Sequence, residues 1–580
     1  MIENVTDAFL NSIKAPRPDG NALNCLLVVP RMAESDRAAY LFPTGLAYIS
    51  SAVKASGRNL HVLNLNYKND CYALLRSTII DRDIRVIMTG GLSAQYKELK
   101  TILDVSKSVN SEIIAIIGGG IVTAEPGVAM QALENADFGV IGEGETAINE
   151  LLYALENNED ALNVPGVIGN GFCNSPARAI DDLDILPFPD YVGLNYYEIQ
   201  SKENSLLNAD MRSPSLILSR SCPFCCTFCF HSSGVKYRRR SIDNVFKEID
   251  WLIKTFAIDS LMINDELFCD KSDYVLEFCE RMKPYNIKYW AQTRVDTVNK
   301  QKLQAIKDSG CDILCMGIES ADNDILKSMK KNITVKQIEM AYDSAIEVGL
   351  VPTGNIILGD LAETAQTYRN SLDWLRRNPQ YSVSVFGLLT FPGSHVYRVA
   401  CERGVIKDRV KYLRDGNFQI NITNMTDEEY RKMFDEADLF NIVYRSTSNF
   451  DEGNFRRNFA LLLEGHKVAL WPATSSNINF LLQTAPDMVY HDNFWLINAN
   501  PNGRYFNSGD RLNGSKSIKT PDVIAEKSID VVVWLFREEA FGNLYDVIKR
   551  DYPMVRSVVK LADLAEKDFS QLTALLNEWE

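Results

Sequence analysis

The sequence lacks any apolar run that approaches the roughly 20 residues of a membrane-spanning helix. Its first residues, MIENVTDAFLNSIK, also lack the basic segment and following apolar stretch that mark a secretory signal. We therefore expect a chain without membrane helices and with a cytoplasmic location.

Positive charge is outnumbered by negative charge, with 61 Lys and Arg against 76 Asp and Glu. The formal net charge of the 580 residues is −15, which disfavours a general nucleic-acid binder because such proteins are usually basic. One local exception is the run KYRRR at residues 236–240, for which a solvated helix start and an anion-facing role are both open. The length exceeds what one hydrophobic core can organise, so about three or four domains are expected.

Histidine is rare and cysteine is unevenly placed, with 5 His and 12 Cys in the chain. A cytoplasmic chain keeps its thiols reduced, so a disulfide framework is not expected. Eight cysteines are scattered, mostly through apolar segments, and are predicted to be free and buried. The other four lie between residues 222 and 229. No second C-x-x-C or H-x-x-x-H follows them, which disfavours a zinc ribbon or finger.

Residues 1–190 alternate strand-like and helix-like segments, which predicts a doubly wound parallel sheet in an α/β protein. Ligands of such sheets lie at the carboxyl ends of the strands. Glycines at these ends either close tight turns or let a large flat ligand approach the backbone, and both interpretations stay open. The predicted strands are 24–29, 61–67, 85–91, 112–120 and the first part of 136–156.

A second series of strands and helices occupies residues 211–400. Its six apolar runs, each followed by a polar residue, predict a partial (β/α)6 barrel with a site at the carboxyl ends of the strands. We interpret residues 191–210 as a linker and residues 401–455 as a helical connector. Residues 456–580 form a third α/β unit.

The stretch SRSCPFCCTFCFHSSG, residues 219–234, carries the clustered cysteines. A thioredoxin-type pair is one interpretation, because two C-x-x-C spacings are present. The other takes Cys222, Cys226 and Cys229 as C-x3-C-x2-C, in which three thiolates hold three irons of a [4Fe–4S] cluster and leave one iron open. This spacing, with an aromatic residue before the last cysteine, resembles the radical S-adenosylmethionine (SAM) superfamily. The resemblance implies that SAM binds the open iron and that one electron cleaves it to a 5′-deoxyadenosyl radical.

Five further fragments resemble signatures of the same superfamily, and they follow the cysteines in the family's order. They are INDELF at 263–268, QTRVD at 292–296, GIESADNDILKSMKKNIT at 317–334, IILGDLAET at 356–364 and FPGSHVY at 391–397. The resemblance implies that the residues contacting SAM are Phe228, Asp265, Arg294, Glu319 and Ser320.

The first domain resembles the cobalamin-binding domain that precedes the barrel in one large branch of that superfamily. The matching pieces are residues 43–57 and 118–145. The domain lacks the D-x-H-x-x-G loop whose His ligates cobalt in many relatives, and its one His, His61, begins a strand. The resemblance implies cobalamin bound without a protein His, or a domain that has lost its cofactor. The implied cobalamin contacts are Ser93, Gly118, Gly119, Gly120, Gly142, Glu143 and Gly144.

Residues 456–580 resemble the Rossmann-like C-terminal domain of certain sugar C-methyltransferases. The segment NANPNGRYF at 498–506 keeps the Asn-Pro of that family, whereas Pro-Ala-Thr at 472–474 replaces its Gly-rich turn. Binding of a nucleotide-linked sugar and a structural or dimerising role both stay open.

Together the resemblances imply a cobalamin-dependent radical SAM enzyme that methylates an unactivated carbon of a small metabolite or nucleotide-linked sugar. Its cofactors would be a [4Fe–4S] cluster, SAM and cobalamin. Its partners would be the small-molecule substrate and an electron donor such as flavodoxin or ferredoxin. The alternative is a radical SAM cyclase, rearrangement or redox enzyme in which cobalamin is not a methyl donor.

Overall fold

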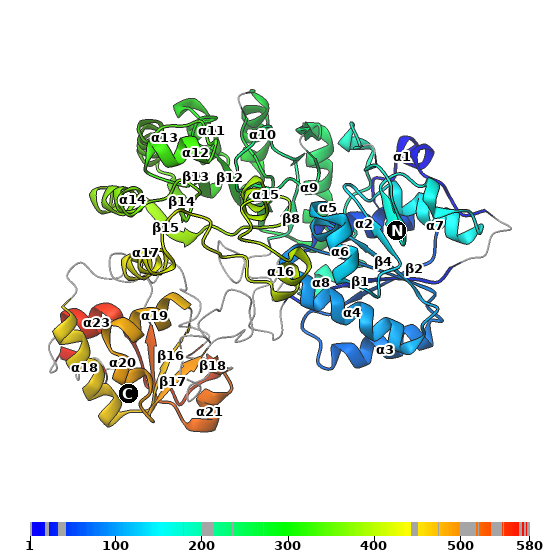
Figure 1. The fold of residues 1–580 in the computed structure, drawn as a ribbon. Helices are drawn as coiled ribbons and strands as arrows, with labels where there is room; N and C mark the ends of the chain where they lie inside the picture. The colour runs from blue at the N-terminus through cyan, green and yellow to red at the C-terminus, as the bar shows by residue number, and fades with distance from the viewer. Residues whose placement is uncertain are drawn as a thin grey trace. The chain divides into compact units, whose positions relative to one another are not determined.

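The computed structural model forms two compact units, in each of which helices and strands alternate (Figure 1). The first comprises Met1–Gly354 and Leu388–Ile422, and the second comprises Asn355–Gly387 and Thr423–Glu580. The predicted α/β class is confirmed. The structure describes residues 3–17, 23–32, 42–177, 179–199, 213–234, 236–270, 272–441, 451–471, 473, 475–497, 518–519, 521–534, 548, 550–567, 571–572 and 576.

The first sheet is the doubly wound parallel sheet that the sequence predicts. Its strand order is β2-β1-β3-β4-β5, parallel throughout, and β6 and β7 extend it antiparallel. The winding reverses between β1 and β3, and ligands of such sheets bind beside that point. The strands are β1 (Cys25–Val29), β2 (Leu60–Asn64), β3 (Val86–Gly90), β4 (Ile114–Gly118), β5 (Phe138–Val140), β6 (Val167–Gly169) and β7 (Phe172–Cys173).

Helices cover both faces of this sheet, which is why runs such as CLLVV at 25–29 are apolar and buried throughout. One hydrophobic cluster places α2 and α7 against one face, and another places α3 and α4 against the other. The helices of this domain are α1 (Asp7–Ser12), α2 (Thr44–Ala55), α3 (Cys71–Asp81), α4 (Tyr96–Val109), α5 (Gly120–Ala124), α6 (Pro126–Ala132) and α7 (Ala147–Glu156).

The second sheet has six strands in the order β15-β14-β13-β12-β11-β8, which follows the chain as in a (β/α) barrel. The pairs recorded from β8 to β14 are parallel. The strands are β8 (Ser215–Leu216), β11 (Ser260–Ile263), β12 (Lys288–Arg294), β13 (Cys311–Gly317), β14 (Val351–Leu358) and β15 (Ser382–Gly387). The helices are α9 (Ile242–Phe256), α10 (Tyr274–Met282), α11 (Lys300–Asp308), α12 (Asn323–Ser328), α13 (Val335–Glu347), α14 (Ala365–Arg377) and α15 (His395–Glu402).

The first barrel strand ends before the cysteine loop begins. It stops at Leu216, and β9 (Ser219–Arg220) then pairs antiparallel with β10 (Arg238–Arg239). The side chain of Asp265 occupies the break, because it accepts hydrogen bonds from the Leu218 N–H and the Ser219 hydroxyl. The cysteine loop therefore begins and ends on a short hairpin.

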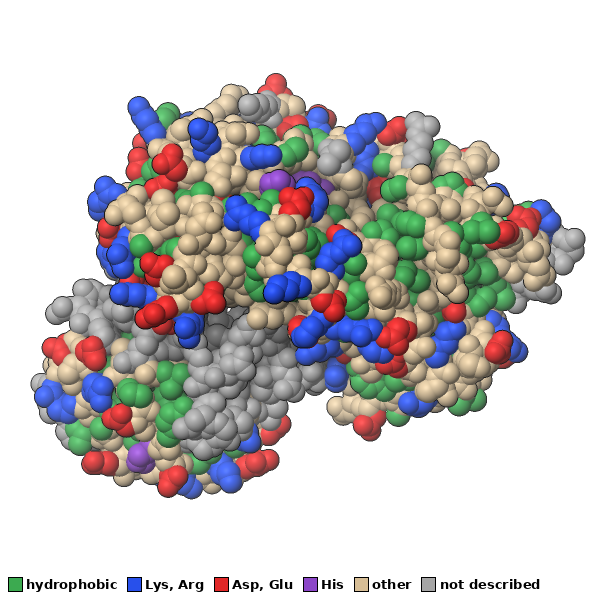
Figure 2. Space-filling model, in the orientation of Figure 1, with side chains coloured by type: hydrophobic (Ala, Val, Ile, Leu, Met, Phe, Trp, Pro, Cys, Tyr) green, Lys and Arg blue, Asp and Glu red, His purple; other side chains and the backbone are tan. Residues whose placement is uncertain are grey.

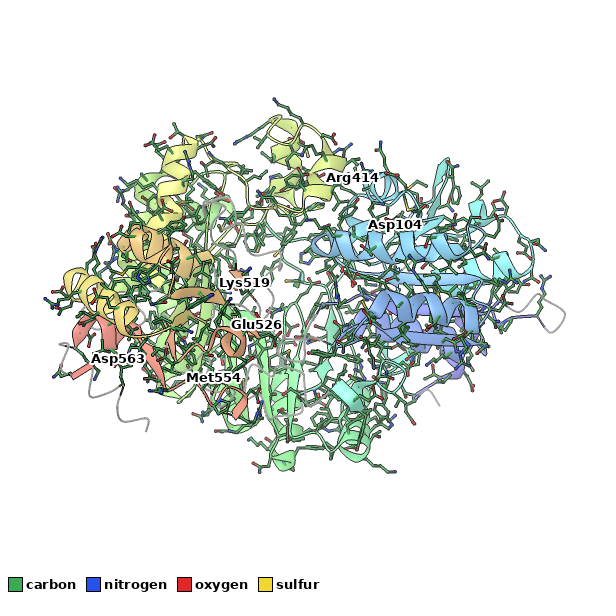
Figure 3. The ribbon with its side chains drawn as sticks, turned by 90° about the horizontal axis from the view of Figure 1, so that it is seen from below. Asp104, Arg414, Lys519, Glu526, Met554 and Asp563 are labelled. Atoms are coloured by element: carbon green, nitrogen blue, oxygen red, sulfur yellow. The ribbon has the colours of Figure 1, made fainter. Side chains whose placement is uncertain are left out.

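The C-terminal sheet has the order β18-β17-β16-β19-β20, which in chain order is the 3-2-1-4-5 of a Rossmann fold. The predicted Rossmann-like domain is confirmed, while the Asn-Pro segment at 498–506 lies outside the described residues. Figure 3 labels Lys519, Glu526, Met554 and Asp563 in this domain. Its elements, with the helices that lead into it, are α17 (Asp427–Leu439), α18 (Glu452–Gly465), β16 (Val468–Leu470), α19 (Ser475–Thr484), α20 (Pro486–Val489), β17 (Phe494–Ile497), β18 (Ile518–Lys519), α21 (Val523–Lys527), β19 (Val531–Trp534), β20 (Ser557–Lys560) and α23 (Leu561–Glu566).

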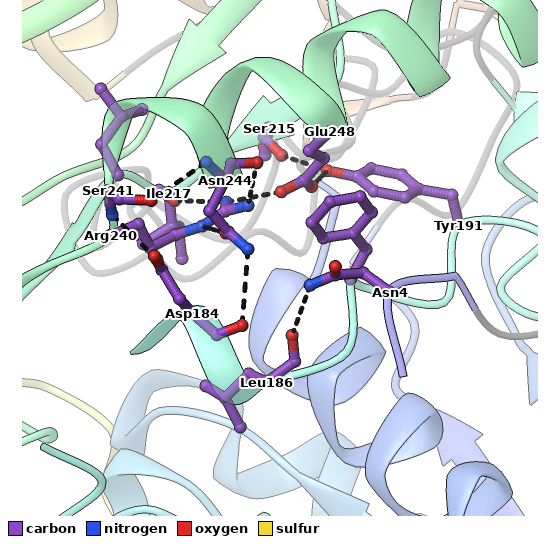
Figure 4. Close-up of polar contacts among 12 residues, drawn as sticks. Asn4, Asp184, Leu186, Tyr191, Ser215, Ile217, Arg240, Ser241, Asn244 and Glu248 are labelled. Atoms are coloured by element: carbon purple, nitrogen blue, oxygen red, sulfur yellow. Dashed lines mark hydrogen bonds and ion pairs between the residues drawn. The ribbon is translucent and has the colours of Figure 1, made fainter. Parts of the chain in front are cut away.

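The first residues of the predicted linker, 191–199, are packed between the first domain and the barrel. Tyr191 is buried, stacks on Phe42 with ring centroids 4.8 Å apart and donates to the Ser215 carbonyl at 2.8 Å. Its hydroxyl also lies 3.0 Å from Glu248, which joins it to the polar network around Arg240 in Figure 4.

Part of the predicted connector packs on the first domain. Leu413 of α16 (Arg409–Asp415) lies in the same hydrophobic cluster as Leu99 of α4. Figure 3 labels Arg414 on this helix and Asp104 on α4. The first domain and the barrel as far as Gly354 thus belong to one compact unit.

The surface of the described residues mixes both signs of charge. In the face shown in Figure 2, Lys and Arg side chains are interspersed with Asp and Glu. Within the described part of the chain, no helix has the length and apolarity needed to cross a membrane.

Candidate functional site

The three predicted cluster ligands lie in one loop that follows β9. Cys226 is buried, Cys222 is half-buried and Cys229 is exposed. The loop is held from within, because the Cys229 N–H donates to the Cys226 carbonyl at 3.1 Å. It is held from outside by the Thr227 N–H, which donates to the Met329 carbonyl at 3.0 Å. All three thiols are free.

Charges around this loop favour a thiolate at Cys226. The hydrogen bond with Cys229 and the positive charges of Lys331 and Arg294 lower the pKa of Cys226 to about 6, although burial opposes them. The Arg294 Nη1 lies 3.6 Å from the Cys226 Sγ. Because the thiolate is the form that binds metals, this setting suits a metal ligand.

The donor set is of the kind that binds iron–sulfur clusters, since it consists of three cysteine thiols in one loop. Each cysteine of a [4Fe–4S] cluster binds a different iron atom, and three cysteines leave one iron open. The assignment of these three cysteines as cluster ligands stays a prediction.

Arg294, at the end of β12, braces the cysteine loop. Its guanidinium carbon lies 3.8 Å from the centroid of the Phe224 ring. Its Nε donates to Asp296 at 2.8 Å and its Nη2 donates to the Lys331 carbonyl. Stacking combined with directed N–H donation is typical of arginine and is not reproduced by lysine. The structure thus joins Arg294 to the loop, and its contact with SAM stays a prediction.

Glu319 lies just beyond β13 and pairs with a lysine that the sequence did not single out. Its Oε1 accepts from the Lys331 Nζ at 2.6 Å, and the two side chains are 14% and 5% exposed. Glu319 has a φ of 67°, a conformation that costs a non-glycine residue roughly 1–2 kcal/mol. Gly317 leaves room for the pair, since a Cβ there would lie 2.5 Å from the Glu319 Oε1 and 2.8 Å from the Lys331 Nζ.

The other predicted SAM contacts have different settings. Asp265 is 1% exposed and accepts from the Leu218 N–H at 2.7 Å and the Ser219 hydroxyl at 2.6 Å. Burial raises the pKa of Asp265 to about 7, although these hydrogen bonds oppose the shift. Ser320 is buried and Phe228 is half-buried. Asp265 therefore holds the chain at the start of the cysteine loop through its hydrogen bonds to Leu218 and Ser219.

The glycines after β3 and β4 are required by neighbouring backbone. A Cβ on Gly119, whose φ is +85°, would lie 2.8 Å from the Gly91 carbonyl oxygen. A Cβ on Gly90 would lie 2.9 Å from the Gly118 carbonyl oxygen. The two turns pack directly on one another, so close packing of the chain explains these glycines without a ligand.

The loop after β5 carries the remaining glycines of this edge. Gly142 has a φ of +80° and open space where a side chain would stand, whereas a Cβ on Gly144 would lie 2.8 Å from Ile49. Glu143, predicted to contact cobalamin, is buried and paired with Arg238. Its role toward a ligand stays a prediction.

We call the residues 90–93, 118–120 and 142–144 the glycine edge. It lies at the carboxyl ends of β3, β4 and β5, next to the point where the winding reverses. Leu92 is 59% exposed there, Gly119 is exposed, and Ser93 is buried in a short 3-10 helix (Ser93–Gln95). Backbone without Cβ and an exposed aliphatic side chain fit the face of a flat macrocycle such as cobalamin.

The cysteine loop and the glycine edge meet at Phe230, which directly follows Cys229. A Cβ on Gly393 would lie 2.5 Å from the Phe230 ring, and a Cβ on Gly120 would lie 3.9 Å from it. The structure therefore brings the two predicted cofactor sites together within one compact unit.

Sequence reasoning missed Lys331, Phe230 and Glu266 as parts of this site. Lys331 lies in the matching fragment 317–334, but only the fold shows that it reaches back 12 residues. His231, which the spacing left aside, pairs through its Nδ1 with Glu266, and this contact raises the pKa of His231.

Comparison with known proteins agrees with this arrangement. Residues 216–375 match the family model of the radical SAM superfamily and residues 35–152 match that of the B12 binding domain. An uncharacterized methyltransferase of Pyrococcus horikoshii is 27% identical over 377 residues, which are 63% of this chain and 79% of that protein. An anaerobic magnesium-protoporphyrin IX monomethyl ester cyclase of Rubrivivax gelatinosus is 24% identical over 507 residues, 79% of this chain and 88% of that protein.

A solved structure also shares the fold. OxsB, a cobalamin-dependent SAM radical enzyme, matches with a TM-score of 0.60 at 16% identity over 96% of this chain and 83% of that one. The resemblances predicted for the first two domains are confirmed, because the chain carries a B12-binding domain followed by a radical SAM domain, and the relatives support an enzyme. A [4Fe–4S] cluster, SAM and cobalamin are the cofactors of these two domain types.

Proposed function

We propose that this chain is a cobalamin-dependent radical SAM methyltransferase that acts on an unactivated carbon of a small metabolite or nucleotide-linked sugar. The observation that carries the proposal is the approach of the cysteine loop to the glycine edge at Phe230. A methyl group can pass to a substrate radical only if both cofactors open onto one enclosed space. The Pyrococcus relative, named an uncharacterized methyltransferase, supports methyl transfer.

When bound, the cluster and SAM supply a 5′-deoxyadenosyl radical that removes hydrogen from carbon, and cobalamin supplies the methyl group. In this proposal Cys222, Cys226 and Cys229 hold the cluster. Arg294 holds the loop in place through Phe224, at 3.8 Å from the ring centroid.

Glu319 provides a carboxylate beside the cluster that suits the ammonium group of SAM. It is held by the Lys331 Nζ at 2.6 Å, so binding of SAM would compete with or extend this ion pair. Because both side chains of the pair are mostly buried, bulk water is excluded from this part of the site, where the radical would form.

We further propose a flavodoxin- or ferredoxin-like electron donor, because the cluster must be reduced before SAM is cleaved. A nucleotide-linked sugar is suggested by the Rossmann-type order of the C-terminal sheet, which in other proteins places a nucleotide at the winding reversal. A cytoplasmic location completes the proposal, since the cluster needs a reducing environment.

A second candidate is a cyclase or rearrangement reaction in which cobalamin does not donate methyl. The Rubrivivax relative, named a cyclase, aligns with 79% of this chain and favours keeping this candidate. The two candidates differ in how they use SAM. A methyltransferase also takes the methyl group from SAM and therefore releases S-adenosylhomocysteine, whereas the second candidate does not.

The test is anaerobic turnover of the reconstituted chain with SAM, reductant, cobalamin and candidate substrates. Methyl transfer predicts both 5′-deoxyadenosine and S-adenosylhomocysteine. Formation of 5′-deoxyadenosine alone would defeat methyl transfer in favour of the second candidate. Formation of neither, in a sample with full iron content, would defeat both.

A further inference from the structure

The three arginines of the basic run at residues 236–240 pair with carboxylates, whereas the Lys236 side chain is 64% exposed. Arg238 and Arg240 are 5% and 4% exposed. Arg240 pairs with Glu248 at 2.5 Å in the network of Figure 4. Arg239, between them, is 30% exposed and pairs with Asp270 at 3.1 Å. Of the three arginines, Arg238 is the one whose side chain pairs with a carboxylate outside the barrel.

Arg238 reaches Glu143 in the glycine edge of the first domain. Its Nη2 lies 2.7 Å from the Glu143 Oε1 and its Nη1 lies 2.9 Å from the Oε2, a bidentate pair. The Ile180 N–H donates to the same carboxylate at 3.0 Å. Bidentate pairs fix direction as well as distance.

Arg220, opposite Arg238 on the hairpin, makes a second connection of the same kind. Its guanidinium lies 3.1 Å from Glu143 and 2.5 Å from Glu145. Its guanidinium carbon also lies 5.0 Å from the centroid of the Tyr48 ring, so α2 of the first domain supports it. Two barrel arginines therefore meet two carboxylates of one loop.

We call these four side chains, Arg220, Arg238, Glu143 and Glu145, the charge quartet. Each is at most 10% exposed, and two positive charges balance two negative ones. Burial alone would raise the pKa of Glu143, but Arg238 and Arg220 outweigh it and lower that pKa. Removing one partner of such a set is strongly destabilising, because it leaves a buried charge uncompensated.

The quartet stands between the two cofactor loops. Glu143 lies between Gly142 and Gly144 of the glycine edge, and Arg220 precedes Cys222 by two residues. We propose that the charge quartet consists of positioning residues that fix the distance between the cobalamin edge and the cluster loop. This inference rests on the proposed function, since only an enzyme using both cofactors needs that distance held.

The need for a fixed distance follows from the reaction. A substrate placed between two cofactors reacts with both only if each lies within bonding reach, and errors near 1 Å are costly. Hydrophobic contact alone permits sliding, whereas bidentate ion pairs define a register. The quartet supplies such a register close to the cluster loop, because Arg220 lies only two residues before Cys222.

The test compares substitutions that keep charge but change geometry. Glu143→Asp withdraws the carboxylate by one methylene, and Arg238→Lys removes the planar fork. Arg239→Lys is the matched control, since it lies on the same strand and pairs with Asp270 inside the barrel. The full-length chain is reconstituted anaerobically with iron, sulfide and cobalamin, then reduced until cobalt(II) and the cluster are both paramagnetic.

Electron paramagnetic resonance then reports the cluster–cobalt distance, because a reduced cluster speeds the relaxation of the cobalt signal more strongly when it is closer. We expect this enhancement to fall in E143D and R238K and to match the parent in R239K, at equal iron and cobalt contents. Equal enhancement in all four proteins would overturn the positioning role and leave the quartet as a stabiliser of the domain contact.

Hydrogen exchange of the chain without cofactors gives a second readout. E143D and R238K should exchange faster than R239K in both loops, at residues 142–146 and at residues 217–222. Faster exchange in only one loop, or in neither, would also overturn the proposal. A parent protein that holds iron but no cobalt would defeat the proposed function, while the exchange result would still decide the quartet.

Discussion

The cysteine loop and the glycine edge face one another, yet they are built by opposite means. The loop is held by charge: Glu319 pairs with Lys331, and Arg294 lies against the Phe224 ring. The turns of the edge at Gly91 and Gly119 are held by backbone packing, since Gly119 leaves no space for a Cβ beside Gly91. The first should respond to loss of a partner and to pH, and the second to any added atom.

The largest expected effect is the loss of the metal cluster from the loop. Cys226→Ala should reduce iron from about four atoms per chain to almost none after anaerobic reconstitution. Cys225→Ala is the matched control, because that exposed thiol is outside the predicted ligand set. Iron and acid-labile sulfide assays decide the point, and full iron in C226A would refute the assignment.

The next effect tests the role of charge in holding the loop. Lys331→Met removes the partner of the mostly buried Glu319, so the unfolding free energy should fall by about 3 kcal/mol. Lys330→Met should change it little, since Lys330 is exposed. Urea unfolding at neutral pH measures both, and equal midpoints for the two variants would contradict the account.

A smaller effect tests the backbone at the glycine edge. Gly119→Ala adds a Cβ 2.8 Å from the Gly91 oxygen at a φ of +85°, which should cost about 2 kcal/mol. Gly127→Ala, in a helix with open space, should be neutral or slightly stabilising. We expect the first variant also to lose cobalamin affinity. Matching thermal midpoints would show that the two turns are not closely packed.

Taken per pH unit, the smallest effect is a slope of stability with pH between about pH 4 and pH 7 that arises on the barrel side. The pKa of Asp265 is raised to about 7, so the folded chain holds this proton more tightly than the unfolded chain. Its contribution is complete below about pH 4 and is lost as pH rises to about 7, at no more than about 1.4 kcal/mol per pH unit.

Asp265→Asn should flatten this slope, because an amide keeps an acceptor for the Leu218 N–H and offers a donor to Ser219. Asp312→Asn, at an exposed carboxylate, should leave the slope intact. Stability measured from pH 4 to pH 8 compares the two. A slope that survives in D265N would assign the pH dependence to another group.

Much of this comparison could be predicted from sequence. Apolar runs such as residues 25–29 gave the strands, and the spacing of Cys222, Cys226 and Cys229 indicated the loop chemistry. These signals are local, so they survive without knowledge of the fold. The strand order of the C-terminal sheet also agrees with the resemblance of residues 456–580.

The rest depends on contacts between distant residues. Glu143 stands between two glycines and looked like part of a ligand site, but its partner Arg238 is 95 residues away. Gly119 could serve a ligand or a neighbouring turn, and only the position of Gly91 decides between them. The run at 236–240 gives no sign that Arg238 pairs with the first domain while Arg239 and Arg240 pair within the barrel.

The central claim is that one chain holds a cluster and cobalamin on facing loops. The most direct measurement is the iron and cobalt content of a single sample, purified and reconstituted without oxygen. The account predicts about four irons and one cobalt per chain, with iron alone lost in C226A. Iron without cobalt in the parent protein, or cobalt lost together with iron in C226A, would contradict it.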